Sequence, residues 1–142
     1  MKLSDILKEK GREVITIAAE ASLTEAAEKM TDRKIGALLV EDRGRLAGII
    51  TERDIVSIVS RTRGDIKSVK VKDVMVRSEN LLVAEPDDQE DYVMAVMIQK
   101  GIRHMPIVEN GEIAGMVSIR DVVRAHVKKL QAQVHFLTDY IK

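Results

Sequence analysis

Apolar and polar positions follow two different periods in the first part of the chain. Residues 14–17 form a short apolar run rich in β-formers, which predicts a strand. Ser22 and Glu25 have the spacing of a helix capping box. The apolar residues that come next have the i, i+3, i+4, i+7 spacing of one helix face: Leu23, Ala26, Ala27 and Met30. The pattern therefore predicts a strand followed by an amphipathic helix.

Two more strands and a second helix complete this pattern. Apolar runs at 36–41 and 45–50 flank an Asp-Arg-Gly turn and predict a pair of strands. A helix is predicted to begin near Arg53. The order of elements is β-α-β-β-α, and the polar, basic stretch 61–72 is interpreted as a linker.

The same order of elements is predicted again in the second half. Strands are expected at 81–84, 104–108 and 112–117, with a helix from Asp88 after the first of them. The Glu-Asn-Gly sequence at 109–111 is a strong hairpin signal. The inward side chains of this helix are predicted to be Val93, Met94 and Met97.

A direct comparison of the two halves shows that they are copies. Residues 44–56 align without a gap on residues 111–123, an offset of 67 residues. Leu-Ser-Asp-Ile-Leu at 3–7 is echoed by Val-Lys-Asp-Val-Met at 71–75. The residues that recur in the longer match are Gly44, Ala47, Gly48, Arg53, Asp54 and Val56, which return as Gly111, Ala114, Gly115, Arg120, Asp121 and Val123. Two copies indicate a duplicated supersecondary unit rather than a solenoid.

The C-terminal end has a different pattern. We assign a first repeat to 1–66, a second repeat to 67–127 and a helical extension to 128–142. The apolar residues of the last helix alternate in steps of four and three, which is a heptad spacing: Val123, Val127, Leu130, Val134, Leu137 and Ile141. Two interpretations stay open, since the helix either folds back on its own domain or contacts a second chain.

Composition narrows the class of protein. Hydrophobic residues are 45% and charged residues 32% of the 142, as in a globular protein. Lys plus Arg and Asp plus Glu are both 23, which argues against a protein that coats nucleic acid or an acidic membrane. The absence of cysteine excludes disulfides and thiolate chemistry and fits a reducing compartment, so we expect a cytoplasmic protein. No apolar run approaches the length of a membrane span.

The strand-to-helix junctions carry the best candidate chemistry. Thr51 and Asp54 in the first copy correspond to Ser118 and Asp121 in the second. The hydroxyl and the amides of a helix start suit an anion, and a carboxylate three residues later suits paired donors such as ribose hydroxyls. The same spacing equally describes a helix cap, in which the carboxylate complements the helix dipole. Both interpretations stay open at this point.

Other candidates for chemistry are weak. His126 and His135 are out of phase on one helix, and the acidic run at 85–91 lacks the glycine of a calcium loop, so no metal site is predicted. Arg53 and Arg120 are expected to meet either a phosphate or a neighbouring carboxylate. Phosphate-loop, serine-hydrolase and dinucleotide motifs are absent, and no nucleophile lies beside a base, so no catalytic residue is predicted and we expect a protein that is not an enzyme.

Taken together, these features resemble the cystathionine β-synthase (CBS) domain family over about residues 3–127. The resemblance rests on the order of elements, the paired Gly-apolar-apolar-Ser/Thr-x-x-Asp segments, and the segments 35–40 and 102–108. It implies an α/β (α+β) fold of two β-α-β-β-α repeats packed by their sheets around a pseudo-twofold axis. It also implies clefts that bind AMP, ADP, ATP, NAD or S-adenosylmethionine, and a homodimer that forms a disc of four CBS motifs.

The resemblance also assigns roles to residues. It implies ribose contacts from Asp54 and Asp121, phosphate contacts from Thr51 and Ser118, and a base lined by the first strand of each copy. Arg103 and His104 would reach the phosphate of the nucleotide at Asp54, so we expect that cleft to bind more tightly. The full set of expected nucleotide-binding residues is Thr16, Ala18, Ala37, Thr51, Arg53, Asp54, Val83, Arg103, His104, Met105, Pro106, Ser118, Arg120 and Asp121.

The function expected on this basis is sensing. A bound adenine nucleotide would change the arrangement of the pair or dimer and so signal to another protein. No cofactor is required for this function, and neither a membrane nor nucleic acid is an expected partner. One alternative is a structural dimerisation module with empty clefts, and another is a hydrolase acting on the bound nucleotide.

Overall fold

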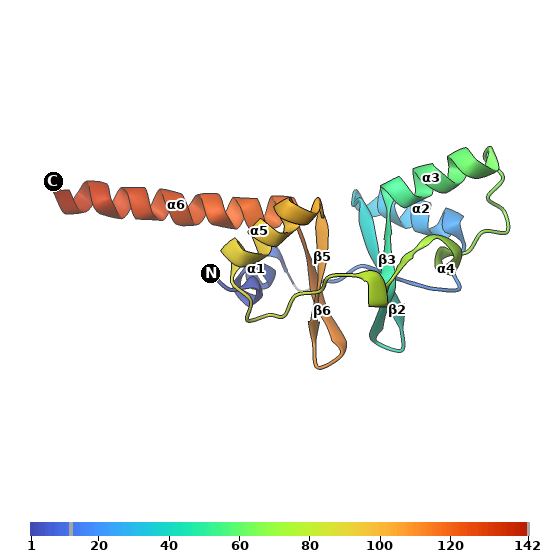
Figure 1. Ribbon diagram of the computed structural model, residues 1–142, viewed down its shortest axis with the longest axis horizontal. Coiled ribbons are helices and arrows are strands. Elements are labelled where there is room, and N and C mark those ends of the chain that lie inside the picture. Colours follow the sequence, from blue (N-terminus) through green and yellow to red (C-terminus); the bar gives the residue numbers. More distant parts are fainter. Residues whose placement is uncertain (12, 142) are drawn as a thin grey trace. The chain divides into compact units, whose positions relative to one another are not determined.

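The computed structural model describes residues 1–11 and 13–141 of the chain (Figure 1). The chain divides into two compact units. Unit 1 comprises Met1–Glu13, Val83–Glu109 and Ala114–Lys142, and unit 2 comprises Val14–Leu82 and Asn110–Ile113. No helix among the described residues is both long and apolar enough to cross a membrane.

Unit 2 contains the first copy of the repeated pattern. Its elements in chain order are β1 (Thr16–Ala18), α2 (Leu23–Arg33), β2 (Ala37–Asp42), β3 (Arg45–Thr51), α3 (Glu52–Thr62), α4 (Val71–Val74), β4 (Val76–Arg77) and a 3₁₀ turn (Ser78–Asn80). Strand β1 runs parallel to β2, whereas β3 is antiparallel to both β2 and β4. The core of this unit comes from β1, α2, β2, β3 and α4: Ile17, Leu23, Ala26, Met30, Leu38, Val40, Ile50 and Val71.

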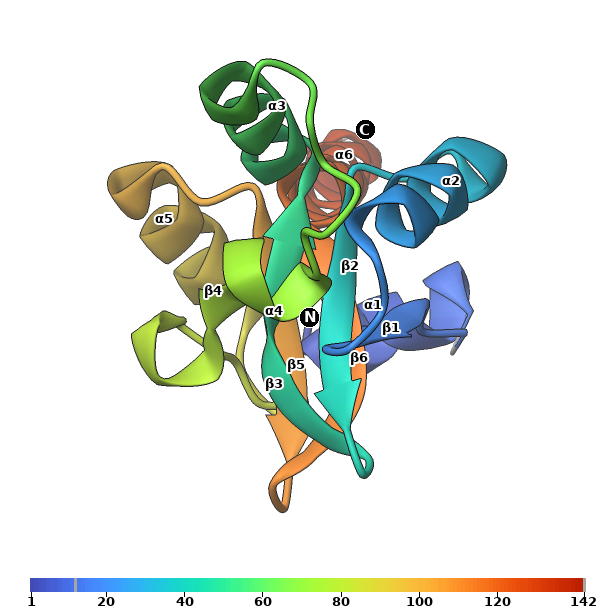
Figure 2. The same ribbon diagram turned by 90° about the vertical axis from the view of Figure 1, so that its right-hand side faces the viewer.

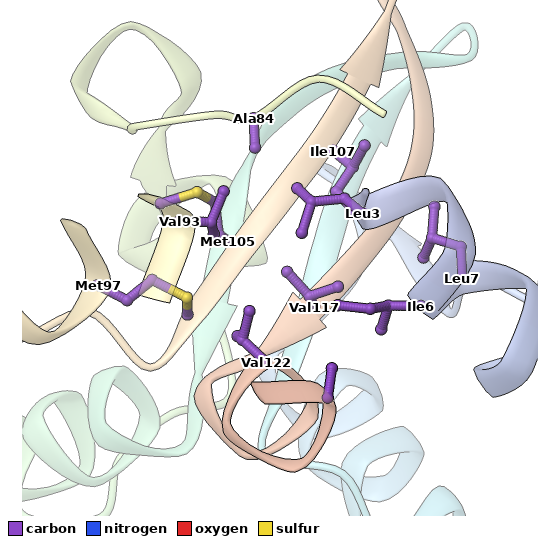
Figure 3. Close-up of a cluster of buried hydrophobic side chains, with 11 residues drawn as sticks. Leu3, Ile6, Leu7, Ala84, Val93, Met97, Met105, Ile107, Val117 and Val122 are labelled. Atoms are coloured by element: carbon purple, nitrogen blue, oxygen red, sulfur yellow. The ribbon is translucent and has the colours of Figure 1, made fainter. Parts of the chain in front are cut away.

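Unit 1 contains the second copy and both ends of the described chain. Its elements are α1 (Leu3–Lys10), α5 (Glu90–Lys100), β5 (His104–Glu109), β6 (Glu112–Ser118) and α6 (Ile119–Ile141), with β5 hydrogen-bonded to β6. Figure 3 shows that the core of this unit gathers side chains from α1, α5, both strands, the start of α6 and the segment before α5: Leu3, Ile6, Leu7, Ala84, Val93, Met97, Met105, Ile107, Val117, Val122 and Ala125.

Most elements confirm the expected order, with shifts at the ends. The strand expected at 14–17 lies at Thr16–Ala18, and the helix expected from Asp88 begins at Glu90. The strand expected at 81–84 is wrong, because only Ala84 forms a β-bridge, to Ile107. The boundary between the two units lies within this run, and Leu82 and Val83 are 45% and 47% exposed, whereas Ala84 is buried in the core of unit 1.

Both hairpins turn where the sequence predicts a turn. Arg43 and Gly44 connect β2 to β3, and both have positive φ angles, 54° and 78°. Asn110 and Gly111 have φ angles of 53° and 80° in the second hairpin. A two-residue turn with φ positive at both positions matches the twist of antiparallel strands, and glycine adopts it without steric cost.

The compact units do not coincide with the repeat boundaries assigned from the sequence, 1–66 and 67–127. The helix α1 lies at the start of the first repeat but packs with the second, where the Leu3 amide donates to Asp88 O and the Glu90 amide donates to Met1 O. The helix α4 lies near the start of the second repeat but packs with the first, where the Val71 amide donates to Ala21 O. The two echo segments at 3–7 and 71–75 are therefore exchanged between the units.

The recurring glycines Gly48 and Gly115 make room for these exchanged segments. A Cβ atom on Gly115 would lie 2.7 Å from Leu7 Cδ2, and one on Gly48 would lie 3.0 Å from Met75 Sδ and closer still to the Val76 carbonyl oxygen. Leu7 and Met75 are the last residues of the two echo segments. Each repeat therefore carries a glycine where the other repeat's leading segment approaches its strand.

We expect the Gly48→Ala variant to be less stable than wild type by about 2–3 kcal/mol, because the added methyl meets a backbone carbonyl that cannot move alone. The matched Gly115→Ala variant should lose only about 1 kcal/mol, since the flexible end of Leu7 can shift. Urea unfolding of both variants measures the difference. Equal losses in the two variants would contradict this account of the repeated glycines.

Candidate functional site

The first junction, from Thr51 to Asp54, is a reciprocal capping box at the point where α3 follows β3 (Figure 2). The Thr51 amide donates to Asp54 Oδ2 at 2.9 Å, and the Asp54 amide donates to Thr51 Oγ1 at 3.3 Å. The Thr51 hydroxyl also donates to Asp54 Oδ2, at 3.0 Å. The capping interpretation is therefore present here, and it holds the carboxylate in one fixed position at the helix start.

The second junction, from Ser118 to Asp121, repeats this arrangement between β6 and α6. The Ser118 amide donates to Asp121 Oδ2 at 2.8 Å, and the Asp121 amide donates to Ser118 Oγ at 3.1 Å. Unlike the Thr51 hydroxyl, the Ser118 hydroxyl donates to no described residue. In both junctions Oδ1 of the aspartate accepts no hydrogen bond from the described part of the chain.

The amides at the two helix starts are mostly used by the protein itself. The Glu52 amide donates to Gly36 O at 3.0 Å, and the Ile119 amide donates to Arg103 O at 2.8 Å. With the third amide of each helix bound to the Thr51 or Ser118 oxygen, the Arg53 and Arg120 amides alone are left without a partner among the described residues. One helix-start amide at each junction is therefore available to an anion, and the anion site expected from the sequence stays a prediction.

A lysine distinguishes the second junction from the first. Lys10, at the end of α1, places Nζ 2.7 Å from Asp121 Oδ2 and donates a second hydrogen bond to Met116 O at 3.0 Å. Asp54 has no ion-pair partner within the described ranges. Burial by itself raises the pKa of the Asp121 carboxyl, but the hydrogen bonds from Lys10 and Ser118 outweigh it, and the pKa lies below its ordinary value.

The other residues of the first copy lie in unit 2. Strand pairing places Ala37 opposite Thr51, and it pairs Thr16 with Leu39 on the neighbouring strand. Ala37 is only 1% exposed, so its side chain is a core position and only its backbone is available to a ligand. Arg53 is exposed and forms no ion pair with the described residues, so its alternative role with a neighbouring carboxylate is not found.

The residues of the second copy lie in unit 1. Arg103 and His104 stand at the start of β5, and Val83 lies just before the bridge at Ala84. Met105 and Pro106 are buried, which makes their side chains part of the core rather than of an open wall. Arg120 is exposed, like Arg53. The expected reach of the Arg103–His104 pair to a phosphate at Asp54 involves both units and stays a prediction.

Two charged residues were missed by the sequence analysis. Lys10 is 111 residues away from Asp121 in the chain, so no local pattern links them. Glu90 is fully buried, and it pairs with His126 Nδ1 at 3.1 Å and with Lys129 Nζ at 3.2 Å. The described residues contain no group of three or more side chains arranged to hold a metal ion.

Replacing Asp121 with Asn should lower stability at pH 7 by about 1–2 kcal/mol, because the charge facing Lys10 is lost. The pKa of Asp121 is lower in the folded chain than in the unfolded chain, so this stability is present above the unfolded value of about 3.9 and is lost as the pH falls through the folded value. Thermal unfolding from neutral to acidic pH should therefore show the two proteins converging only in acid. Asp87→Asn, at an 86% exposed side chain, is the matched control and should change little.

Comparisons with known proteins show the family of this chain. The sequence pattern described as "CBS domain" matches residues 3–61 and 71–128. A relative from Arabidopsis thaliana, "CBS domain-containing protein CBSX3, mitochondrial", is 34% identical over 147 residues, which cover 99% of this chain and 71% of the relative.

Solved structures give the same result. The CBS-domain containing protein ATU1752 from Agrobacterium tumefaciens superposes with a TM-score of 0.82 and 36% identity over 89% of this chain and 99% of its own. The CBS domain pair of protein MJ0100, solved in complex with 5′-methylthioadenosine and S-adenosyl-L-methionine, superposes with a TM-score of 0.78 and 28% identity over 91% of this chain and 98% of its own. With two family matches that follow the two copies of its internal repeat, the chain belongs to the CBS domain family as a tandem pair.

Proposed function

We propose that this chain is a regulatory module that binds a ligand containing adenosine and signals its presence to a partner protein. The observation that carries the proposal is the aspartate fixed at each strand-to-helix junction. At Asp54, Oδ2 accepts hydrogen bonds from the Thr51 amide and the Thr51 hydroxyl, and Oδ1 accepts none from the described residues. A ribose hydroxyl can therefore donate to this carboxylate without breaking the cap.

The class of ligand follows from what the candidates share. AMP, ADP, ATP, NAD and S-adenosylmethionine all contain adenosine, and the MJ0100 domain pair was solved with two adenosyl compounds that carry no phosphate. Few helix-start amides remain for a phosphate in this chain, since only those of Arg53 and Arg120 lack a partner in the described residues. Recognition through the ribose therefore fits this chain better than recognition through a phosphate alone.

We expect the two junctions to differ in affinity, with Asp54 the stronger site. Lys10 compensates the charge of Asp121 and lies against the same carboxylate that a ribose would approach. No cation of the described residues does this at Asp54. A ligand at Asp121 must therefore compete with an internal ion pair, whereas a ligand at Asp54 meets a carboxylate whose charge is unpaired.

Binding without catalysis is the second part of the proposal. The junction hydroxyls of Thr51 and Ser118 have an aspartate as neighbour, and that aspartate is held by backbone amides as a cap. The Thr51 hydroxyl donates to Asp54 Oδ2, but that oxygen also accepts the Thr51 amide as part of the helix cap, and the Ser118 hydroxyl donates to no described residue. Both carboxylates are therefore assigned a capping and binding role rather than that of a general base. A hydrolase would release product from ATP, so analysis of the nucleotide after incubation separates the two functions.

Signalling requires that the ligand prefer one arrangement of the pair or of an assembly. The ligand can change the populations of the two arrangements only as far as its affinities for them differ. A structural module without a ligand remains the second candidate function, because both junctions already form complete capping boxes. Ligand binding decides between these two functions.

Asp54→Asn should weaken binding of the preferred adenosyl ligand by about tenfold, since the amide keeps one acceptor oxygen but loses the charge. Asp121→Asn, the same change at the equivalent position, should have a smaller effect. Isothermal titration with AMP, ATP, NAD and S-adenosylmethionine measures both. Equal losses would contradict the inequality of the two sites, and no binding of any ligand to wild type would favour the structural module.

Lys10→Met should strengthen binding at the Asp121 junction by about fivefold, because it removes the competing ammonium group while keeping an apolar stem. Titration of this variant in the Asp54→Asn background isolates the second site. Lys8→Met, on the same helix with no ion pair in the described residues, is the control. Unchanged or weaker binding in Lys10→Met would show that Lys10 does not compete with the ligand.

A further inference from the structure

The last helix, α6, has two separate apolar faces. One face packs inside unit 1, where Val122 and Ala125 are buried. The same side of the helix is held to α5 by the contacts of His126 and Lys129 with the buried Glu90. These contacts end near residue 129, and the C-terminal half of α6 continues beyond the other elements of its unit (Figure 1).

The second face is the heptad seam, and its side chains are solvent-exposed. No described residue covers it, and the exposed fractions of its members are 40% for Val123, 45% for Val127, 46% for Leu130, 63% for Val134, 59% for Leu137 and 79% for Ile141. The helix therefore does not fold back on its own unit through the seam, which was one of the two interpretations of the sequence. Because Val122 is buried and the adjacent Val123 exposed, the seam is not a continuation of the core face.

The kinds of residue in the seam specify how it can pair. If the d positions are Val123, Leu130 and Leu137, the a positions are all β-branched: Val127, Val134 and Ile141. β-Branched residues at a with leucine at d favour a parallel coiled coil of two strands. A shallow hollow along this part of the helix, into which a side chain of a second helix can insert, is lined by Val127, Leu130, Gln131, Val134, His135 and Thr138.

The positions that flank the seam carry no charge over the same stretch. Gln131 and Thr138 occupy the e positions, and Gln133 and Tyr140 occupy the g positions. Charged residues at e and g select a different partner or repel an identical one. Two identical copies of this helix therefore meet without like-charge repulsion, and nothing in the flanks selects a foreign helix.

We propose that α6 pairs with α6 of a second copy of this chain as a short parallel coiled coil over residues 127–141. The a and d residues of one helix face the same residues of the other, and the two unit 1 bodies lie at the same end of the coil. The seam spans about two heptads, which places the contact among small interfaces and gives an affinity of micromolar order. This proposal needs no ligand and stands apart from the proposed nucleotide function.

The first test measures the mass of the full chain by sedimentation equilibrium from about 1 to about 100 µM, without nucleotide. Wild type should change from monomer to dimer over this range. Leu137→Glu should raise the dimer dissociation constant by at least about a hundredfold, because two charges would enter the apolar seam. Phe136→Glu is the matched control, since Phe136 is adjacent and 68% exposed but lies at a c position outside the seam.

Leu137 and Phe136 are 59% and 68% exposed and belong to neither buried core, so both variants should keep the thermal unfolding temperature and helix content of dilute wild type. A wild type that stays monomeric throughout the range would overturn the proposal. A dimer that Leu137→Glu leaves intact, or that Phe136→Glu weakens equally, would also overturn it and would point to another interface.

The second test fixes the direction of pairing, and it is simple because the chain contains no cysteine. In a parallel coil, Leu130→Cys and Leu137→Cys should each form a disulfide-linked dimer with themselves under mild oxidation. Ala132→Cys, at an outward f position, should stay monomeric on a non-reducing gel. Crosslinks that form only when the Leu130→Cys and Leu137→Cys chains are mixed would show an antiparallel pair and overturn the parallel assignment.

Discussion

Each compact unit of this chain is completed by a short segment from the beginning of the other repeat. The segment at 3–7 packs on the strand of Gly115, and the segment at 71–75 packs on the strand of Gly48. Both glycines are needed because the approaching segment occupies the space of a Cβ atom. Neither repeat can therefore build its native core from its own continuous stretch of chain, which makes the exchange the constraint on which the fold depends.

The exchange also explains why two nearly identical junctions are chemically unequal. Because α1 packs with the second copy, its last residue, Lys10, reaches Asp121. At the offset of the echo segments, the residue after α4 that corresponds to Lys10 is Ser78, which carries no charge. The duplication therefore preserved the capping box of each copy, whereas the surrounding charge differs between Asp54 and Asp121.

The helices that follow the two junctions, α3 and α6, differ in length although they come from duplicated sequence. The helix α3 ends at Thr62, whereas its counterpart α6 continues to Ile141 and carries an apolar face that its own unit leaves uncovered. The buried carboxylate of Glu90 anchors the first half of α6 through His126 and Lys129. A firmly anchored helix with an exposed, regular seam is a suitable means of joining two copies.

The sequence by itself determined the features that depend on neighbours a few residues apart. The spacing of Thr51 and Asp54 predicts a capping box, the Asn110–Gly111 pair predicts a hairpin turn, and the repeat predicts two copies of one unit. These features follow from hydrogen bonds and dihedral preferences that are local in the chain. The sequence also predicts the heptad spacing of α6, but it does not predict whether another part of the chain covers the heptad seam.

Only the tertiary structure decided the features that join distant parts of the chain. The pairing of Lys10 with Asp121, the burial of Glu90 and the exchange of α1 and α4 depend on which segments pack together, and no short-range pattern encodes that choice. The same limit explains the wrong strand at 81–84, since Leu82 and Val83 satisfy β-propensity but stay exposed, and only Ala84 forms a β-bridge. Local spacing therefore sets the capping box, and long-range packing sets the charges around it and the face of α6 that stays exposed.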